Sequence, residues 1–202
     1  MVDRETIFKL VSEVLDGTDL RLKVDAFSLR ENLEDGQAEV RCDIHDQRTG
    51  ERHTIDGRGV GLVDAFFNGV VAVYSGQYPS LKSIRFADFA IKATTDTGRQ
   101  AARSDMAAQV TVSIANSDNR EFVFSRASQS ITGASLTVVL KGVEFFINSE
   151  RAYIAVYQAL QHARKEKRPD SVARYTEQLS VLVEATSYSE VIERLQRDKA
   201  HA

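Results

Sequence analysis

The amino-acid sequence predicts an α+β fold made of a duplicated β-β-β-α unit with pseudo-twofold symmetry, flanked by an N-terminal helix and a C-terminal helical arm. Three observations support this prediction. Alternating apolar and polar residues, typical of half-buried strands, recur in two groups, and an apolar helical segment follows each group. This order repeats once after about 70 residues, a period longer than that of solenoid repeats. From residue 149 onward the alternation is replaced by helical spacing.

The chain opens with a predicted short amphipathic helix. Apolar side chains recur at helical spacing through residues 3–15, and the pair Asp16-Gly17 is a typical helix stop. We therefore assign residues 1–17 to an N-terminal helix.

The first repeat, residues 18–78, combines three strands with one helix. Alternation predicts consecutive antiparallel strands at residues 20–29, 38–44 and 52–55. Closely spaced glycines then break the extended pattern. Residues 64–74 are apolar on most sides, as expected for a helix that packs hard against a sheet.

The second repeat, residues 79–150, returns to the same order. Its predicted strands and helix cover residues 83–93, 107–114, 121–124 and 134–147. The strand segment Ala38-Glu39-Val40 corresponds to Ala108-Gln109-Val110. Each helix should cover the apolar face of its own sheet, so that the two units, joined back to back, make one domain over residues 18–150.

A helical tail is predicted over residues 151–202. Helical spacing extends over residues 149–167, 171–186 and 189–199. The apolar stripes consist of Val172, Tyr175, Leu179, Leu182 and Val183, and of Val191, Ile192 and Leu195. Because the tail's charges are mixed rather than basic, we expect these stripes to pack on the domain or on a second copy, not on a membrane surface.

Composition excludes several classes of function. A net charge of -3 gives no basic surface for nucleic acid, and the acidic N-terminal residues do not resemble a signal peptide. No run of apolar residues is expected to span a bilayer. Cys42 is the only cysteine, which rules out an internal disulfide, and its place in an alternating strand predicts a buried core residue. We expect a cytoplasmic protein with no cofactor, no metal, and neither nucleic acid nor membrane as a partner.

The string from Gly57 to Asp64 carries closely spaced glycines from a strand into a helix. A dinucleotide-binding fingerprint would need glycine where Asp64 stands, and the Walker lysine is absent. The structural interpretation is that the glycines permit a tight turn and that Asp64 stabilises exposed N–H groups at the helix start.

The corresponding string of the second repeat, from Ser128 to Ser135, offers four hydroxyl groups at a helix start. A catalytic serine is not predicted, because G-x-S-x-G is missing and no histidine is placed nearby. N-capping is the default interpretation. The four histidines are far apart and lack metal-ligand spacing. Asp105 lies in a charged loop, for which solvation is the plain interpretation and ligand contact the alternative.

The glycine-rich string now suggests a family. Residues 59–68, Gly-Val-Gly-Leu-Val-Asp-Ala-Phe-Phe-Asn, resemble the G-x-G-x-V-D-A-x-x-N signature of the regulatory domain of 2-isopropylmalate synthases and citramalate synthases. Residues 105–110 resemble that domain's D-A-x-A-x-V strand, and residues 130–135 are similar to its D-I-I-x-A-S helix start. Asn148 stands where the family's closing asparagine falls. The resemblance extends over residues 20–150.

The resemblance implies an allosteric domain of leucine biosynthesis that dimerises and binds leucine or isoleucine around the helix starts. The effector-binding residues that it implies are Gly59, Gly61, Val63, Asp64, Ala65, Asp105, Ser130, Ile131, Thr132, Gly133 and Ala134. The family's chemistry belongs to a metal-dependent TIM barrel of roughly 250 residues, for which this chain has no room. We therefore expect a non-catalytic homodimer that acts with a separate barrel synthase subunit.

Two alternatives remain open. The chain could be an assembly module without a ligand, its old pocket filled by Leu62, Phe66 and Phe67. An unrecognised enzyme is the other alternative, although no acid-base or nucleophile constellation is found in the sequence.

Overall fold

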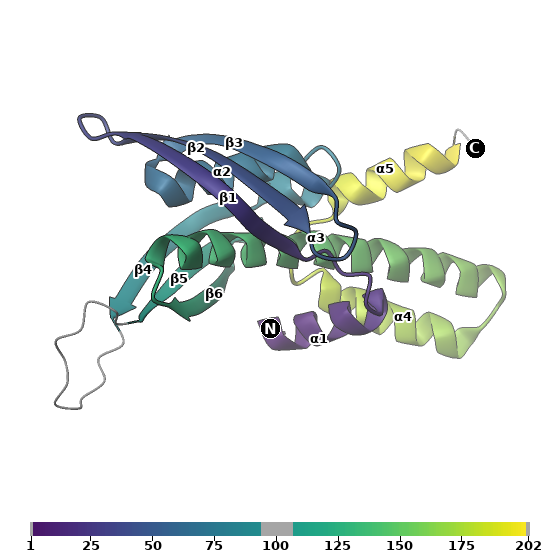
Figure 1. Ribbon diagram of the computed structural model, residues 1–202. Coiled ribbons are helices and arrows are strands. Elements are labelled where there is room, and N and C mark those ends of the chain that lie inside the picture. Colours follow the sequence, from purple (N-terminus) through teal and green to yellow (C-terminus); the bar gives the residue numbers. More distant parts are fainter. Residues whose placement is uncertain (1, 94–106, 201–202) are drawn as a thin grey trace, which may run out of the picture.

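The fold consists of two three-stranded antiparallel sheets, each followed by a helix, as the sequence predicts. A computed structural model describes residues 2–93 and 107–200 (Figure 1). The first sheet has the order β1 (Leu22–Asn32), β2 (Gln37–Asp46), β3 (Arg52–Val60), and the second has the order β4 (Arg85–Ala93), β5 (Ala108–Ala115), β6 (Glu121–Ser128). The helices are α1 (Arg4–Leu15), α2 (Gly61–Tyr74), α3 (Ile131–Lys165), α4 (Pro169–Leu182) and α5 (Ser189–Ala200).

Strand β2 shows why alternation identified the sheets. Its buried apolar side chains occupy every second position and belong to the core, and they are Ala38, Val40, Cys42 and Ile44. Cys42 is thus a buried core residue, as predicted, and burial raises the pKa of its thiol to about 12.

Both sheets contain an irregularity that the alternation does not reveal. The register of β1 against β2 shifts between Val24 and Ala26, and that of β4 against β5 shifts between Phe86 and Asp88. A bulge of this kind bends its strand and increases the local twist. The first strand of each repeat therefore carries the same feature.

The glycines before α2 do not end the strand, contrary to the sequence prediction. Strand β3 continues to Val60, and Gly57 and Gly59 pair with residues of β2. A Cβ at Gly57 would overlap the carbonyl oxygen of Ala65, and one at Gly69 would lie 2.9 Å from the Gly57 Cα. The glycines are needed because the backbones of β3 and α2 approach each other closely.

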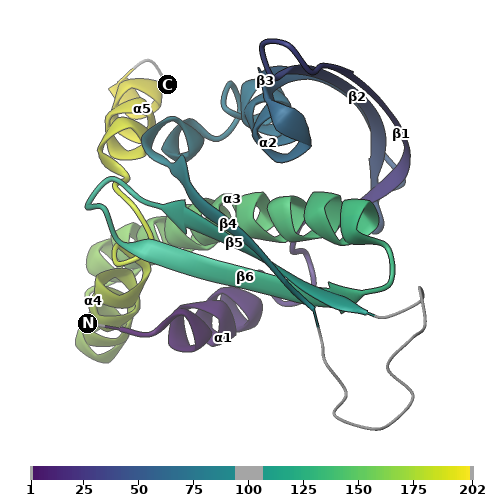
Figure 2. The same ribbon diagram turned by 90° about the vertical axis from the view of Figure 1, so that its left-hand side faces the viewer.

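Helix α3 is continuous from Ile131 to Lys165, so the predicted boundary at residue 150 falls inside it. Nothing in this stretch stops a helix, because the next proline is Pro169. Figure 2 shows α3 lying between the two sheets. An 18-residue window of α3 is apolar and long enough to cross a membrane by composition alone, with a mean hydropathy of 1.3, whereas no membrane-spanning run was predicted. However, 67% of that window is buried inside the structure, as in the core helix of a globular domain.

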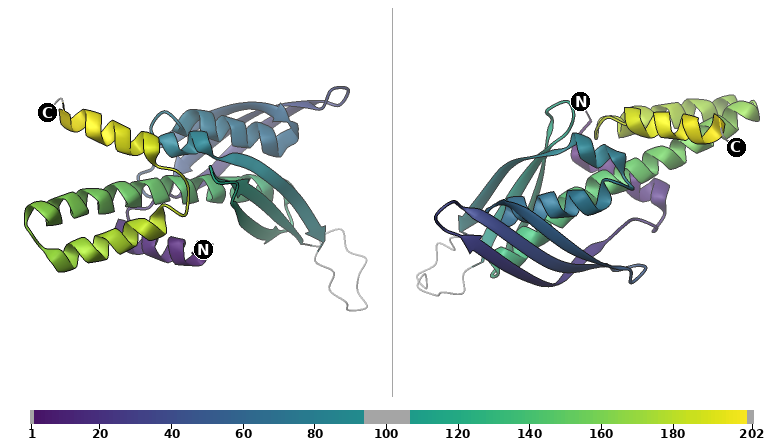
Figure 3. Two further views of the ribbon diagram at one scale, coloured as in Figure 1. Left: turned by 180° about the vertical axis from the view of Figure 1, so that it is seen from behind. Right: turned by 90° about the horizontal axis from the view of Figure 1, so that it is seen from above.

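The helical tail packs back onto the domain. Helices α3 and α4 form an antiparallel pair, and α5 lies beside the short 3₁₀ helix η1 (Pro79–Ser83) (Figure 3). Leu182 and Val191 are buried, while Tyr175, Leu179, Ile192 and Leu195 pack against the core. Val183 is 46% exposed, so that part of the first stripe faces outward.

Candidate functional site

The start of α2 lacks a side-chain cap. Its N-cap residue is Val60, and Gly61 has φ = 73°, a left-handed conformation that favours glycine. The Gly61 N–H donates to the Gly36 carbonyl at 3.1 Å. Leu62 and Val63 follow in the first turn, where backbone N–H groups have no partner within the helix. This end of α2 therefore offers donors to an anion.

Asp64 stabilises the same helix start from inside the first turn. Its Oδ2 accepts a hydrogen bond from the Val60 N–H at 2.9 Å and another from Asn68 Nδ2 at 3.3 Å. Asn68 also donates to the Arg58 carbonyl at 3.1 Å. The predicted role of Asp64 at the helix start is confirmed, and its hydrogen bond is to the backbone N–H of the N-cap residue Val60.

Serine side chains cap the start of α3. Ser130 Oγ accepts from the Gly133 N–H at 3.1 Å, and Ser128 Oγ accepts from the Ser130 N–H at 3.1 Å. The hydroxyls of Ser135 and Thr137 donate to carbonyls of their own helix, at 2.8 and 2.7 Å. The predicted N-capping is confirmed.

The implied effector residues divide into two groups by position. The side chains of Ala65 and Ala134 are fully buried beneath their helices, and a Cβ at Gly59 would lie 2.7 Å from the Ala65 nitrogen. These three positions are occupied by packing between helix and sheet. The half-buried or exposed members are Gly61, Val63, Asp64, Ser130, Ile131, Thr132 and Gly133. Asp105 lies outside the described residues.

A cavity of about 900 Å³ reaches the start of α3, where Gly133 lines it. Helix α1, strands β1 and β6, and helix α3 enclose it. Apolar walls come from Phe8, Phe27, Phe124, Leu136, Leu140 and Phe145. The charged lining residues are the bases Arg4, Arg21, Lys23, Arg126 and Lys141 and the acids Glu5, Asp19, Asp25 and Glu144. Among the described residues, Gly133 is the only implied effector residue that lines this cavity. Sequence reasoning missed the other residues that line this cavity because they come from four separate elements.

Glu144 lines this cavity, and it joins the two repeats. Its Oε1 accepts a hydrogen bond from the Leu22 N–H of β1. Burial raises the pKa of the Glu144 carboxyl to about 7, against the lowering effects of the Leu22 N–H and of Lys141. Its charge therefore changes near neutral pH.

Asn148 makes a second connection between the repeats, one turn further along α3. Its Oδ1 accepts from the Leu20 N–H at 2.8 Å, and its Nδ2 donates to the Leu20 carbonyl at 3.0 Å. An asparagine side chain can satisfy both backbone groups of one residue in this way. The family-like asparagine thus holds the segment just before β1 to α3.

Comparison with known families agrees with this architecture. The family model described as the LeuA allosteric (dimerisation) domain matches residues 1–147. The match includes α1, whose buried residues belong to the same core, and it ends within α3. Among curated proteins the chain finds no match.

Proposed function

The chain belongs to the LeuA allosteric (dimerisation) domain family, and from this membership we propose that it is a non-catalytic regulatory module which binds a small amino-acid-like effector and acts with a separately encoded acyl-transferase. An effector of the leucine or isoleucine type carries a carboxylate, an ammonium group and a branched apolar side chain. A site for it needs apolar walls and a few polar groups of both charges.

The observation that carries this proposal is the 900 Å³ cavity at the start of α3. Its aromatic and aliphatic walls suit a branched side chain. Arg126 or Lys141 can receive the carboxylate near the Gly133 end, and Glu144 can receive the ammonium group. Binding of an ammonium group would favour the ionised form of Glu144 over the neutral form that burial favours.

Calorimetric titration with L-leucine, L-isoleucine and 4-methylpentanoate tests the proposal. The last compound is leucine without its ammonium group. Glu144→Gln should weaken leucine binding by about tenfold, because a charge-assisted hydrogen bond is lost, and should leave 4-methylpentanoate binding unchanged. Equal weakening of both ligands would place the ammonium group elsewhere.

A second pair of variants tests whether the effector reaches the helix start. The methyl group of Gly133→Ala would lie at the cavity wall, 3.1 Å from Ser130 Oγ, so it perturbs the cap as well as the cavity. Ser130→Ala is the matched control, because it removes the cap without adding an atom to the cavity. Weaker effector binding in Gly133→Ala than in Ser130→Ala would support the proposed site.

Assembly as a homodimer is the other part of the proposal, and the family is one of dimerisation domains. Exposed apolar side chains border the large cavity: Phe8 is 62% exposed and Phe27 is 44% exposed, while Leu29 on the same strand is 40% exposed. Sedimentation should give a dimer of a 22.5 kDa chain, and Phe27→Ser should weaken it while Val183→Ser on the tail should not. A wild-type monomer at micromolar concentration would contradict this part.

The exposed phenylalanines also favour a second candidate function, an assembly module without a ligand. A partner copy would then cover Phe8 and Phe27 and fill the cavity that the effector would otherwise occupy. A dimer whose unfolding temperature does not change with any amino acid would favour this candidate, because a ligand that binds the native state must raise its apparent stability.

A further inference from the structure

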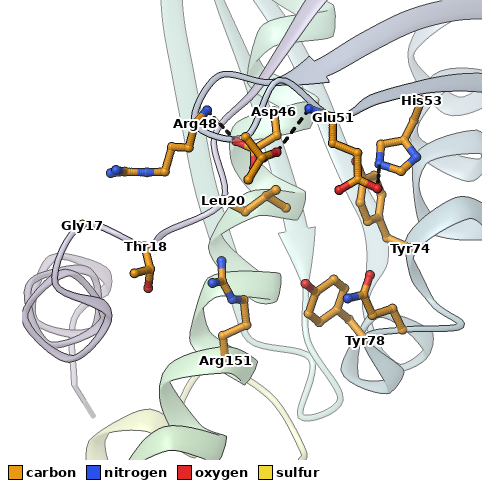
Figure 4. A pocket seen from close by; sticks show the side chains of 12 residues that line it. Gly17, Thr18, Leu20, Asp46, Arg48, Glu51, His53, Tyr74, Tyr78 and Arg151 are labelled. Atoms are coloured by element: carbon orange, nitrogen blue, oxygen red, sulfur yellow. Dashed lines mark hydrogen bonds and ion pairs between the residues drawn. The ribbon is translucent and has the colours of Figure 1, made fainter.

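A second cavity lies at the other end of α2 from the glycine-rich start. Its volume is about 610 Å³, within the range of roughly 300 to 1,000 Å³ that small-ligand pockets occupy. The connection from α1 to β1, the turn from β2 to β3 and the end of α2 wall it, and Arg151 of α3 completes it (Figure 4). None of the described effector residues implied by the family resemblance lines this cavity.

Arg151 is a cation that no acid of the described chain neutralises. Its guanidinium lies 3.5 Å from Asn148 Oδ1, at the limit of a hydrogen bond, and makes no ion pair with any described carboxylate. Arg48, across the cavity, differs because it pairs with Asp19. Figure 4 shows the Arg151 guanidinium directed into the cavity, with the Tyr78 hydroxyl pointing toward it. The donors of Arg151 are thus available to an anion.

Two tyrosines line this cavity, and the hydroxyl of one of them is buried without a partner among the described residues. Tyr74 is 5% exposed, and its hydroxyl has no hydrogen-bond partner among the described residues. Buried hydroxyl groups are nearly always paired, so this one points to a missing partner. Burial raises the pKa of Tyr78 while the positive charge of Arg151 opposes the rise, which places the phenol in the field of the guanidinium. Both hydroxyls are protonated donors at neutral pH.

The acids of this cavity are already engaged by their own turn. Asp46 accepts hydrogen bonds from the Arg48 N–H and from Thr49 Oγ1, each at 3.0 Å. Glu51 Oε1 lies 3.4 Å from His53 Nε2. The two carboxylates do not reach Arg151, but they would repel a dianion that entered beside it. The cavity therefore favours a ligand with a single negative charge.

We propose that this cavity is a separate ligand site, which binds a small monocarboxylate that carries a second hydrogen-bonding oxygen. The carboxylate lies against Arg151 and Tyr78, a guanidinium and a phenol that both donate to it. The second oxygen meets the Tyr74 hydroxyl and supplies its missing partner. Leu20 and the tyrosine rings cover the apolar part of the ligand.

Titration of the full chain with L-3-phenyllactate and 3-phenylpropanoate tests the site, because the two probes differ by one hydroxyl group. Phenyllactate should bind saturably and more tightly. Arg151→Gln should weaken both probes by about tenfold or more, as expected for loss of a charged donor. Tyr74→Phe should weaken phenyllactate alone, a selective effect that a merely structural role would not produce.

Controls separate this site from the proposed effector site. Arg164→Gln, at the exposed end of α3, and Glu144→Gln, in the larger cavity, should leave both probes unchanged. If circular dichroism shows that the glutamine variant does not fold, Arg151→Lys takes its place. This variant keeps the charge and should still weaken the binding of both probes. Leucine binding should be unchanged in the Arg151 variants, so the proposal for one site can be contradicted without contradicting the proposal for the other.

Three results would overturn the inference. They are the absence of saturation by phenyllactate up to about 10 mM, undiminished affinity in a folded Arg151 variant, and tighter binding of inorganic phosphate than of either carboxylate.

Discussion

The two repeats share strand order, a bulge in the first strand and a helix after the third, yet they attach that helix in different ways. In the first repeat α2 meets β3 backbone to backbone, through Gly57 and Gly69. In the second repeat α3 meets its sheet through side chains, where a Cβ at Gly142 would overlap the Cδ1 of Ile114. The same topology is therefore compatible with two kinds of packing.

The ends of the two helices differ as well. Helix α2 begins without a side-chain cap and ends at Tyr74, beside the smaller cavity. Helix α3 begins with the Ser130 cap and continues to Lys165, so that it also carries the tail. The helix of the first repeat thus has polar groups available at both ends. The helix of the second repeat instead supports both its own sheet and the tail.

The largest expected effect tests the difference in helix packing. Gly57→Ala should destabilise the fold by about 3 kcal/mol or more, because the new methyl group meets a carbonyl oxygen that cannot move alone. Gly142→Ala should cost about 1 to 2 kcal/mol, since the end of the Ile114 side chain can shift and alanine favours a helix. Urea unfolding of both variants measures this, and equal losses would remove the distinction.

The contact between the repeats should be sensitive to pH. Glu144 has a folded-state pKa of about 7 against an ordinary value of 4.5, so the native state binds the extra proton between these values. Stability from this group is fully present below pH 4.5 and is lost as pH rises through 7.

The expected fall in the free energy of unfolding is roughly 2 kcal/mol, after allowance for solvent near the cavity. Glu144→Gln keeps an acceptor for the Leu22 N–H and should flatten this part of the pH profile. A wild-type profile with no fall between these pH values would contradict the account.

The two helix starts can be compared through the side chains that accept backbone hydrogen bonds there. Asp64→Ala and Ser130→Ala should each cost about 0.5 to 2 kcal/mol, because each removes one acceptor for a backbone N–H. Asp64→Asn should recover part of the loss, since its amide oxygen can still accept from Val60. Unfolding midpoints measure all three, and an unchanged midpoint in Asp64→Ala would show that Asp64 does not stabilise the helix start.

The smallest expected effect concerns the end of α2. Tyr74→Phe should leave the free protein equally stable or raise its unfolding free energy by up to about 1 kcal/mol, because it removes a buried hydroxyl without a partner. Thermal unfolding without ligand measures this. A clear loss of stability would mean that the hydroxyl is already satisfied.

Most of the architecture could be predicted because its signals are local. Alternation placed the strands, the helical spacing placed α1, α2 and the tail, and Ser130 and Asp64 were identified as helix-start residues before the fold was known. The candidate site could be predicted only in part. The glycine-rich string and its duplicate mark the helix starts, but the cavity beside Gly133 depends on side chains from α1, β1 and β6.

By itself, then, the sequence determined the fold class, the duplication and the family, because each depends on residues that are neighbours along the chain. The tertiary structure decided where β3 ends, how far α3 runs and where the cavities lie. Those features depend on pairs far apart in sequence, such as Leu22 with Glu144 and Leu20 with Asn148. Burial and close approach between such residues follow from packing, and no local pattern of polar and apolar residues encodes them.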